Sequence, residues 1–283
     1  MAALLALLSA TAYGVGDYFG GLSARRLPSA AVVLRTHAAG LLGLLAVVPL
    51  VGGAAAQGDL AIGAAGGLAG ALGVLAFYRA MASGSMSLVA PVTAVTAAIV
   101  PVGYGLATGE RPSLVSLVGI PLALVAVTLL SREGGARSAS SLSVEQLLTA
   151  LGAGAGFGLY FVALGMTSHD AGLWPVVAGR VASVTLFGLV ALASPAARVG
   201  DGRARQRGVL AMLVTCGLLD AWANALFLLA TRHGMLTVVA VLGALYPAAT
   251  LLLARGVLGE RLARPQLGGV ALATAAVALV AIG

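Results

Sequence analysis

Apolar stretches long enough to cross a lipid bilayer follow one another along the whole chain, and this feature limits the possible fold more than any other. Hydrophobic residues make up 60% of the 283 residues and charged residues only 9%, whereas soluble globular domains are about 25% charged. Helices satisfy all their backbone hydrogen bonds internally, which lipid requires. The sequence therefore predicts an all-α integral membrane protein and excludes an ordinary soluble fold.

A transmembrane helix needs about 20 mostly apolar residues, and about ten segments of the chain meet this requirement. Their approximate bounds are 2–22, 30–51, 60–81, 86–107, 113–131, 145–166, 173–194, 208–230, 236–258 and 265–283. These runs do not show the alternation of apolar and polar residues that membrane β-strands require. We therefore expect about ten transmembrane helices joined by mostly short connections.

The chain also contains an internal repeat. The segment 77–94, FYRAMASGSMSLVAPVTA, aligns without a gap on 227–244, FLLATRHGMLTVVAVLGA, at an offset of 150 residues. The same offset places the GER tripeptide at 109–111 on a second GER at 259–261. Chance supplies some matches in such an apolar sequence, but a tripeptide with two charges at the same offset is harder to obtain by chance.

This repeat divides the chain into three parts: a first five-helix repeat at 1–131, a linker at 132–144 and a second five-helix repeat at 145–283. Because five is an odd number, the second repeat enters the membrane from the opposite side to the first. The predicted arrangement is an inverted repeat, which is common in secondary transporters and places the substrate near the membrane midplane between the repeats.

All 16 basic residues are arginine, and they are unevenly distributed among the connections. Eleven lie on or beside the odd-numbered connections, whereas only Arg111 and Arg232 lie on the even-numbered ones. The positive-inside rule then predicts that the odd-numbered connections are cytoplasmic and that both termini are outside. The basic residues form no stripe with interleaved aromatic residues, so no nucleic-acid partner is expected.

Asp220 and Asn224 are polar residues inside the eighth predicted span, in the run GLLDAWANALFLLA. They lie four residues apart and so share one helix face, which Phe227 extends. Ionisable groups at the bilayer centre are costly and usually serve a function. Asp220 is therefore a candidate proton-titrating or substrate-contacting group, the alternative being a neutral carboxyl that hydrogen-bonds a neighbouring helix.

Asp17 in the first span and Arg35 in the second would lie at similar depth if the two helices were antiparallel neighbours. An ion pair between them and a substrate-binding role for Asp17 are both consistent with this placement. Tyr13 lies one turn before Asp17 on the same face. Arg180 aligns with Arg35 in the repeat, and we expect a structural role for it, in which its side chain extends toward the interface or anchors the seventh helix.

Glu110 and Glu260 belong to the two GER tripeptides at helix ends. Each glutamate directly precedes an arginine, so we expect local pairing that fixes the turn rather than contact with a substrate.

The repeat and its motifs resemble those of the drug/metabolite transporter superfamily, specifically its EamA-type members. The most specific part is FYRAMASGSMSLVAPVTAVTAAIVPV running into GERPSLVSLVGIPLALVAV, with a weaker counterpart ending in GERLARPQLGGVALATAAVALV. This resemblance implies ten helices in two inverted five-helix halves and the export of small metabolites or amino acids. It also implies termini in the cytoplasm, which is opposite to the orientation that the arginine distribution predicts.

The leading functional hypothesis is an alternating-access secondary transporter in the plasma membrane that exports a small molecule, with protons as a candidate coupling ion. A membrane-embedded enzyme and a non-transporting scaffold are the alternatives. An enzyme is not favoured, because the histidines at 37, 169 and 233 lack a metal-binding spacing and Cys216 is the only cysteine. We expect no metal site, no cofactor and no nucleotide-binding loop.

Overall fold

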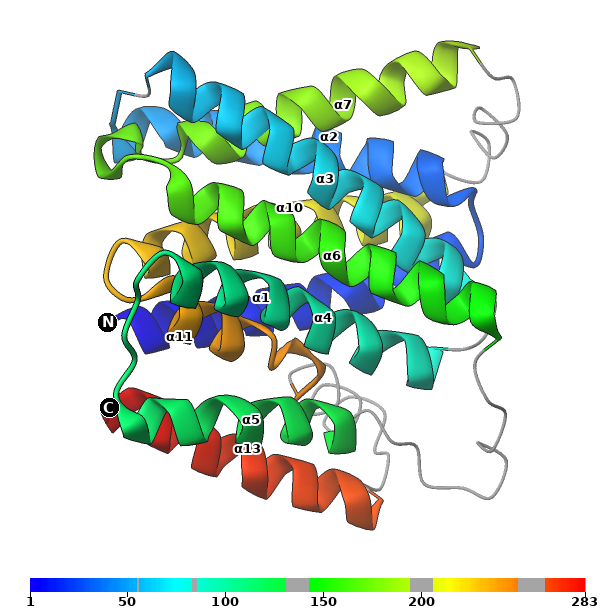
Figure 1. Ribbon diagram of the computed structural model, residues 1–283. Coiled ribbons are helices and arrows are strands. Elements are labelled where there is room, and N and C mark those ends of the chain that lie inside the picture. The colour runs from blue at the N-terminus through cyan, green and yellow to red at the C-terminus, as the bar shows by residue number, and fades with distance from the viewer. Residues whose placement is uncertain (55, 83–85, 131–142, 194–205, 249–262, 283) are drawn as a thin grey trace.

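The structure is a computed structural model that describes the whole chain except residues 55, 83–85, 131–142, 194–205, 249–262 and 283. The described residues form ten α-helices and the short 3-10 helix η1 (His169–Ala171) (Figure 1). The α-helices are α1 (Ala2–Ala24), α2 (Ser29–Val51), α3 (Gln57–Ala82), α4 (Met86–Ala107), α5 (Leu114–Leu130), α6 (Val144–Met166), α7 (Trp174–Ala193), α10 (Arg207–Thr231), α11 (Leu236–Gly243) and α13 (Arg264–Ile282).

In the described part of the chain, seven helices are long and apolar enough to cross a membrane, and three further helical segments are apolar but shorter. The multi-pass helical class is thus confirmed. The predicted span at 86–107 coincides with α4, and the bounds of the other spans agree within a few residues except at 236–258, where α11 already ends at Gly243. Residues 249–258 of that predicted span lie outside the described residues, so a count of ten crossings stays a prediction.

The contacts between the two halves come in matching pairs, so that swapping the halves leaves the pattern of helix neighbours unchanged. The first helix of each half packs on the third helix of the other half, which gives the pairs α1–α10 and α3–α6. The third helix of each half also contacts the second helix of the other half, in the pairs α3–α7 and α10–α2. The two fifth helices, α5 and α13, pair with each other. Two equivalent halves related by a two-fold axis would produce this pattern.

Small residues allow the central helices to approach closely. A Cβ atom added to Gly67 of α3 would overlap the backbone of Gly179 on α7, and one added to Gly63 would overlap Pro175. On the other side of the bundle, a Cβ atom on Gly217 of α10 would overlap the backbone of Thr36 on α2. Close backbone approach through small residues is a common way of packing helices in membranes, where burial of apolar side chains provides little driving force.

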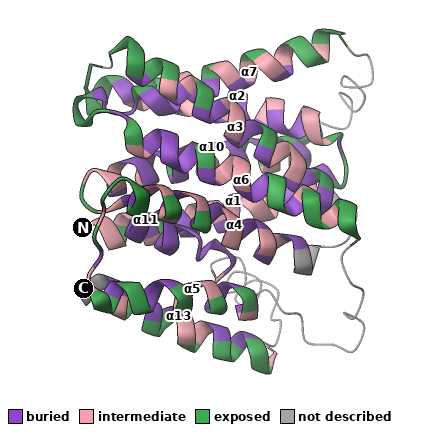
Figure 2. Ribbon diagram, viewed as in Figure 1, coloured by how far each residue is buried: buried purple, intermediate pink, exposed green. Residues whose placement is uncertain are grey.

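The outer surface of the bundle suits lipid. Large apolar side chains remain exposed there, including Leu50 with 85% exposure and Leu114 with 82%. Figure 2 shows buried residues on the inward faces of the helices and exposed residues on the outward faces. Both termini lie at one end of the bundle, together with the connections that follow α2, α4, α6 and α10 (Figure 1).

Candidate functional site

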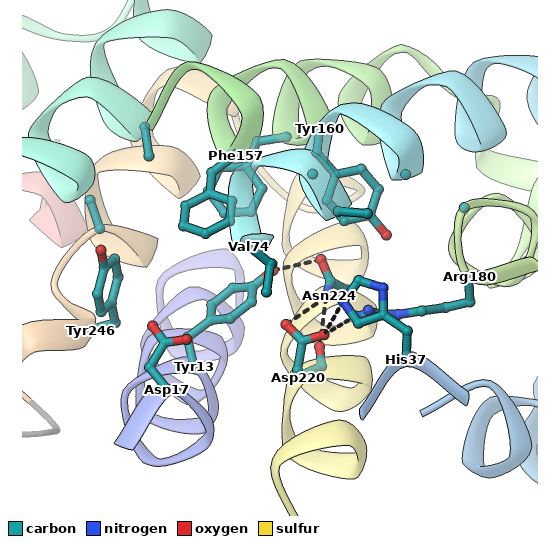
Figure 3. A pocket seen from close by; sticks show the side chains of 17 residues that line it. Tyr13, Asp17, His37, Val74, Phe157, Tyr160, Arg180, Asp220, Asn224 and Tyr246 are labelled. Carbon is teal, nitrogen blue, oxygen red and sulfur yellow. Dashed lines mark hydrogen bonds and ion pairs between the residues drawn. The ribbon is translucent and has the colours of Figure 1, made fainter. Parts of the chain in front are cut away.

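A cavity lies between the two halves of the bundle (Figure 3). Its wall is formed by α1, α2, α3 and α4 from the first half and by α6, α7, α10 and the segment after α11 from the second. The space between its atoms is about 650 Å³ with the open mouth included, which is in the size range of small-molecule sites. The polar side chains of its wall belong to Tyr13, Asp17, His37, Tyr160, Arg180, Asp220, Asn224 and Tyr246.

A buried ion pair joins α7 to α10 at this cavity. Nη2 of Arg180 donates to Oδ2 of Asp220, and the two side chains are only 5% and 19% exposed. Of the two structural roles that the sequence suggested for Arg180, extension toward the interface is not observed, and the ion pair instead anchors α7 to α10. The side chain points into the bundle because a carboxylate on another helix compensates its charge. Without this partner, the arginine would have to extend toward the interface to keep its charge in water.

Asn224 links the ion pair to the first half of the chain. Its Nδ2 donates to the backbone oxygen of Asp220 at 2.6 Å, and its Oδ1 accepts from the hydroxyl of Tyr13 on α1 at 2.7 Å. These residues were singled out from the sequence, and the structure brings all three to one wall of the cavity. Their hydrogen bonds cross from α10 to α1, so they couple the halves as well as line the space.

His37 is a member of the cavity that sequence reasoning missed. Its Nε2 lies 3.9 Å from Oδ2 of Asp220, and its Nδ1 is 2.5 Å from the hydroxyl oxygen of Ser183 on α7. The histidines were considered only as metal ligands, and a lone histidine lacks the spacing that a metal site requires. Its position inside an apolar span was the available signal, because polar groups there are costly and normally have a partner.

Asp17 lines the cavity, and its carboxyl has no hydrogen-bond or ion-pair partner within the described part of the chain. The ion pair with Arg35 that the sequence allowed is not formed. The main neighbour of α1 is α10, with few contacts to α2, so the assumption that consecutive helices are nearest neighbours was wrong. Nη1 of Arg35 donates to the backbone oxygen of Ala31 at 3.1 Å, and Arg35 is absent from the cavity wall.

Phe227 supports the cavity from behind. It is fully buried and stacks on Phe161, with ring centroids 4.1 Å apart and planes inclined by 18°. Phe161 lines the cavity and contacts the ring of Tyr13 at a centroid distance of 5.9 Å. Phe227 itself is not part of the cavity wall, so it acts on the site through Phe161.

Glu110 has a different role from the one predicted. Its carboxylate accepts hydrogen bonds from the backbone N–H groups of Leu236 and Thr237, at 2.7 Å and 2.8 Å, and from the hydroxyl of Thr237. It therefore caps the first turn of α11 in the opposite half instead of pairing with the adjacent arginine. Its counterpart Glu260 lies outside the described residues.

Comparison with known proteins supports a family assignment. The model of the EamA-like transporter family matches residues 1–132 and again residues 145–282. A solved structure titled "Crystal structure of protein" is 17% identical, with a TM-score of 0.74 over 99% of this chain and 96% of that chain, so the likeness shows a shared fold. Comparison with curated proteins gives no match. Because the two matched segments cover nearly the whole chain, this protein belongs to the EamA-like transporter family.

Proposed function

We propose that the protein is a secondary transporter that moves a small molecule through the central cavity by alternating access. The observation that supports the proposal is the cavity itself, because both halves of the chain build it and because its charged side chains belong to helices long and apolar enough to cross a membrane. Transporters built from inverted repeats bind their substrate at such a site between the repeats. Rocking of one half against the other then exposes the site to each side of the membrane in turn. Of the two cargo classes that the family resemblance implies, we propose small metabolites.

We also propose that the transporter is an exporter in the plasma membrane, driven by protons that move inward. A carboxyl group that exchanges a proton must be free of a permanent counter-ion. Asp220 is held by Arg180, whereas Asp17 has no such partner among the described residues. Of the two acids that the sequence suggested, Asp17 is therefore the better candidate for proton exchange, and Asp220 for maintaining the architecture of the site.

The experiment is a transport screen in proteoliposomes made with the purified protein. Pools of small metabolites are tested for uptake with and without a pH gradient, against liposomes that lack the protein. We expect at least one compound to accumulate faster in the presence of the gradient. If the protein is a scaffold, no compound will enter beyond the protein-free control, and this outcome overturns the proposal.

A matched pair of variants tests whether the cavity is the transport path. Val74 lines the cavity, and Val181 is exposed on the outer surface of α7. Phenylalanine at position 74 narrows the cavity, so Val74→Phe should reduce uptake about tenfold, the effect of losing roughly 1.4 kcal/mol of substrate binding. Val181→Phe adds the same volume toward lipid and should leave uptake unchanged. Equal uptake by the two variants would exclude this cavity as the path.

A further inference from the structure

The charges that line the central cavity do not cancel. In the described part of the cavity wall, the full charges belong to Asp17, Arg180 and Asp220, and the ion pair uses two of them. His37 lies beside this ion pair, with its Nε2 3.9 Å from Oδ2 of Asp220, and it forms no ion pair with Asp17 within the described residues. One carboxylate, that of Asp17, remains without a counter-ion. The cavity wall therefore carries one negative charge that no positive charge of the described wall compensates.

An ionised carboxylate without a partner is costly in an apolar environment. Asp17 lies in α1 among glycines and apolar residues, between the last turn of the helix and the hydrogen-bonded Tyr13. Figure 3 shows its carboxyl group in the cavity, apart from the Arg180–Asp220 pair. Two species can compensate this charge, namely a proton in the empty site and a cationic group of a bound molecule.

Much of the remaining wall is aromatic. Phe157, Tyr160 and Phe161 of α6 line the cavity together with Tyr13 and Tyr246. The flat faces of such rings attract ammonium groups and also bury apolar groups. A molecule with one ammonium group and a compact apolar or aromatic body therefore matches both the charge and the surface of this wall.

The same wall is poorly suited to a carboxylate. The cation of the described wall that could receive one is Arg180, whose Nη2 already binds Asp220 while its Nε has no hydrogen-bond partner among the described residues. A zwitterionic amino acid that used this guanidinium carries no net charge, so its binding would leave the excess negative charge of the cavity uncompensated, which is unfavourable. An anionic molecule would in addition be repelled by Asp17.

We propose that the cavity selects organic monocations, with Asp17 as the counter-ion of a primary or secondary ammonium group and the aromatic wall holding the apolar body. The proposal rests on the proposed transport function, of which it specifies the substrate class. It places the specificity for charge on α1 of the first half, whereas the corresponding helix of the second half, α6, contributes aromatic rings.

Three probes of nearly the same shape test this selection: phenethylamine, phenylalanine and 3-phenylpropionate. They carry a cationic, a zwitterionic and an anionic group, respectively, at neutral pH. Binding to the purified full-length protein in nanodiscs is measured by isothermal titration calorimetry. We expect phenethylamine to bind at least about tenfold more tightly than either of the other probes, equivalent to one lost charge interaction.

Variants of Asp17 assign the selection to this residue. Asp17→Asn should weaken phenethylamine binding about tenfold or more, and Asp17→Glu should restore most of it, because the carboxylate returns. Asp170→Asn removes an exposed carboxylate in η1, outside the cavity, and should bind like the parent protein. Thermal unfolding of each variant in detergent verifies that Asp17→Asn is folded.

The outcomes separate this inference from the proposed function, because binding in nanodiscs needs no transport. Tighter binding of phenylalanine than of phenethylamine, or equal phenethylamine binding by Asp17→Asn and the parent, overturns the inference even if proteoliposomes transport another compound. Selective binding of the amine that depends on Asp17, without transport of any compound, supports the inference and refutes the transport function.

Discussion

At the scale of single residues, the centre of this protein depends on a pair of charges that neither helix could carry alone. Arg180 is 4% exposed, and its guanidinium cannot lose a proton under physiological conditions. A carboxyl group, in contrast, is a weak acid that also exists in a neutral form. Removal of the two partners therefore has different consequences. Without the arginine, the remaining carboxyl group can be uncharged, whereas without the aspartate the positive charge of the guanidinium remains buried in the bundle.

This inequality predicts an order of stability among three variants. Asp220→Asn should lower the stability by about 3–5 kcal/mol, as expected when one partner of a buried pair is removed. Arg180→Gln should cost less, because protonated Asp220 is neutral. The double variant should be more stable than Asp220→Asn, since it contains no unpaired charge. Thermal unfolding in detergent measures all three, and equal losses for the two single variants would contradict the argument.

The sequence predicted half of this site for a clear physical reason. Tyr13, Asp17, Asp220 and Asn224 stood out because polar residues inside apolar spans are costly, and each of them lines the cavity. The partnership of Asp220 with Arg180 could not be predicted, because it depends on how α7 and α10 rotate about their axes. Sequence spacing indicates which residues of one helix share a face, but it does not indicate which helix that face meets.

At the scale of elements, α11 shows how one half of the chain stabilises a helix of the other. Met235 at its N-cap makes no capping hydrogen bond with its side chain. Glu110 supplies the missing acceptor from the turn after α4, where Gly109 has a φ of 98° and lets the chain fold back. A Cβ atom on Gly105 would overlap the Glu110 carboxylate, so the small residue leaves space for the cap.

Removal of this cap should destabilise the protein to a modest degree. Glu110→Gln keeps one acceptor oxygen but loses the negative charge at the positive end of the α11 dipole, at a cost of about 1–2 kcal/mol. Glu145 is an exposed glutamate in the first turn of α6, so Glu145→Gln is the matched control and should change stability by a few tenths of a kcal/mol at most. Unfolding curves in detergent compare the two. An equal effect of both substitutions would show that the cross-half hydrogen bonds contribute little.

The positions of the helices were far easier to predict than their partners. Span bounds follow from the length of an apolar run, which lipid thickness imposes on each helix separately. The packing of α1 on α10 and of α3 on α6 joins segments far apart in sequence, and no local pattern encodes it. The repeat did predict that the halves are equivalent, and their exchangeable contacts agree with that expectation.

At the scale of the whole molecule, the two halves share a framework but differ in chemistry. The repeat aligns Asp220 of α10 with Gly70 of α3, and both residues line the same cavity. A Cβ atom on Gly70 would lie 3.0 Å from the ring of Tyr160, so a second carboxylate at this position of α3 would require the Tyr160 ring to shift. An almost symmetrical bundle thus encloses an asymmetrical site, with its ion pair supplied by the second half and its unpaired carboxyl by the first.

The orientation of the bundle is the last prediction. Within the described residues, the arginines at the end of the bundle that carries the termini are Arg111 and Arg232. The guanidinium of Arg232 donates hydrogen bonds to the backbone oxygen and the hydroxyl oxygen of Thr167. An arginine that stabilises the fold in this way gives little support for a cytoplasmic location of that end. From the excess of arginines on the odd-numbered connections we predict that these connections are cytoplasmic and that the termini are outside.

Single cysteines can test this orientation in cells, because the native Cys216 is buried and should not react. His233→Cys lies at the end with the termini, and Gln206→Cys lies at the opposite end; both positions are exposed, and neither substitution changes an arginine. A membrane-impermeant maleimide should label His233→Cys in intact cells but should label Gln206→Cys only after permeabilisation. The parent protein, with Cys216 alone, controls for background labelling. The reverse pattern would place the termini in the cytoplasm, and the positive-inside rule would then fail for this protein despite its eleven-to-two distribution of arginines.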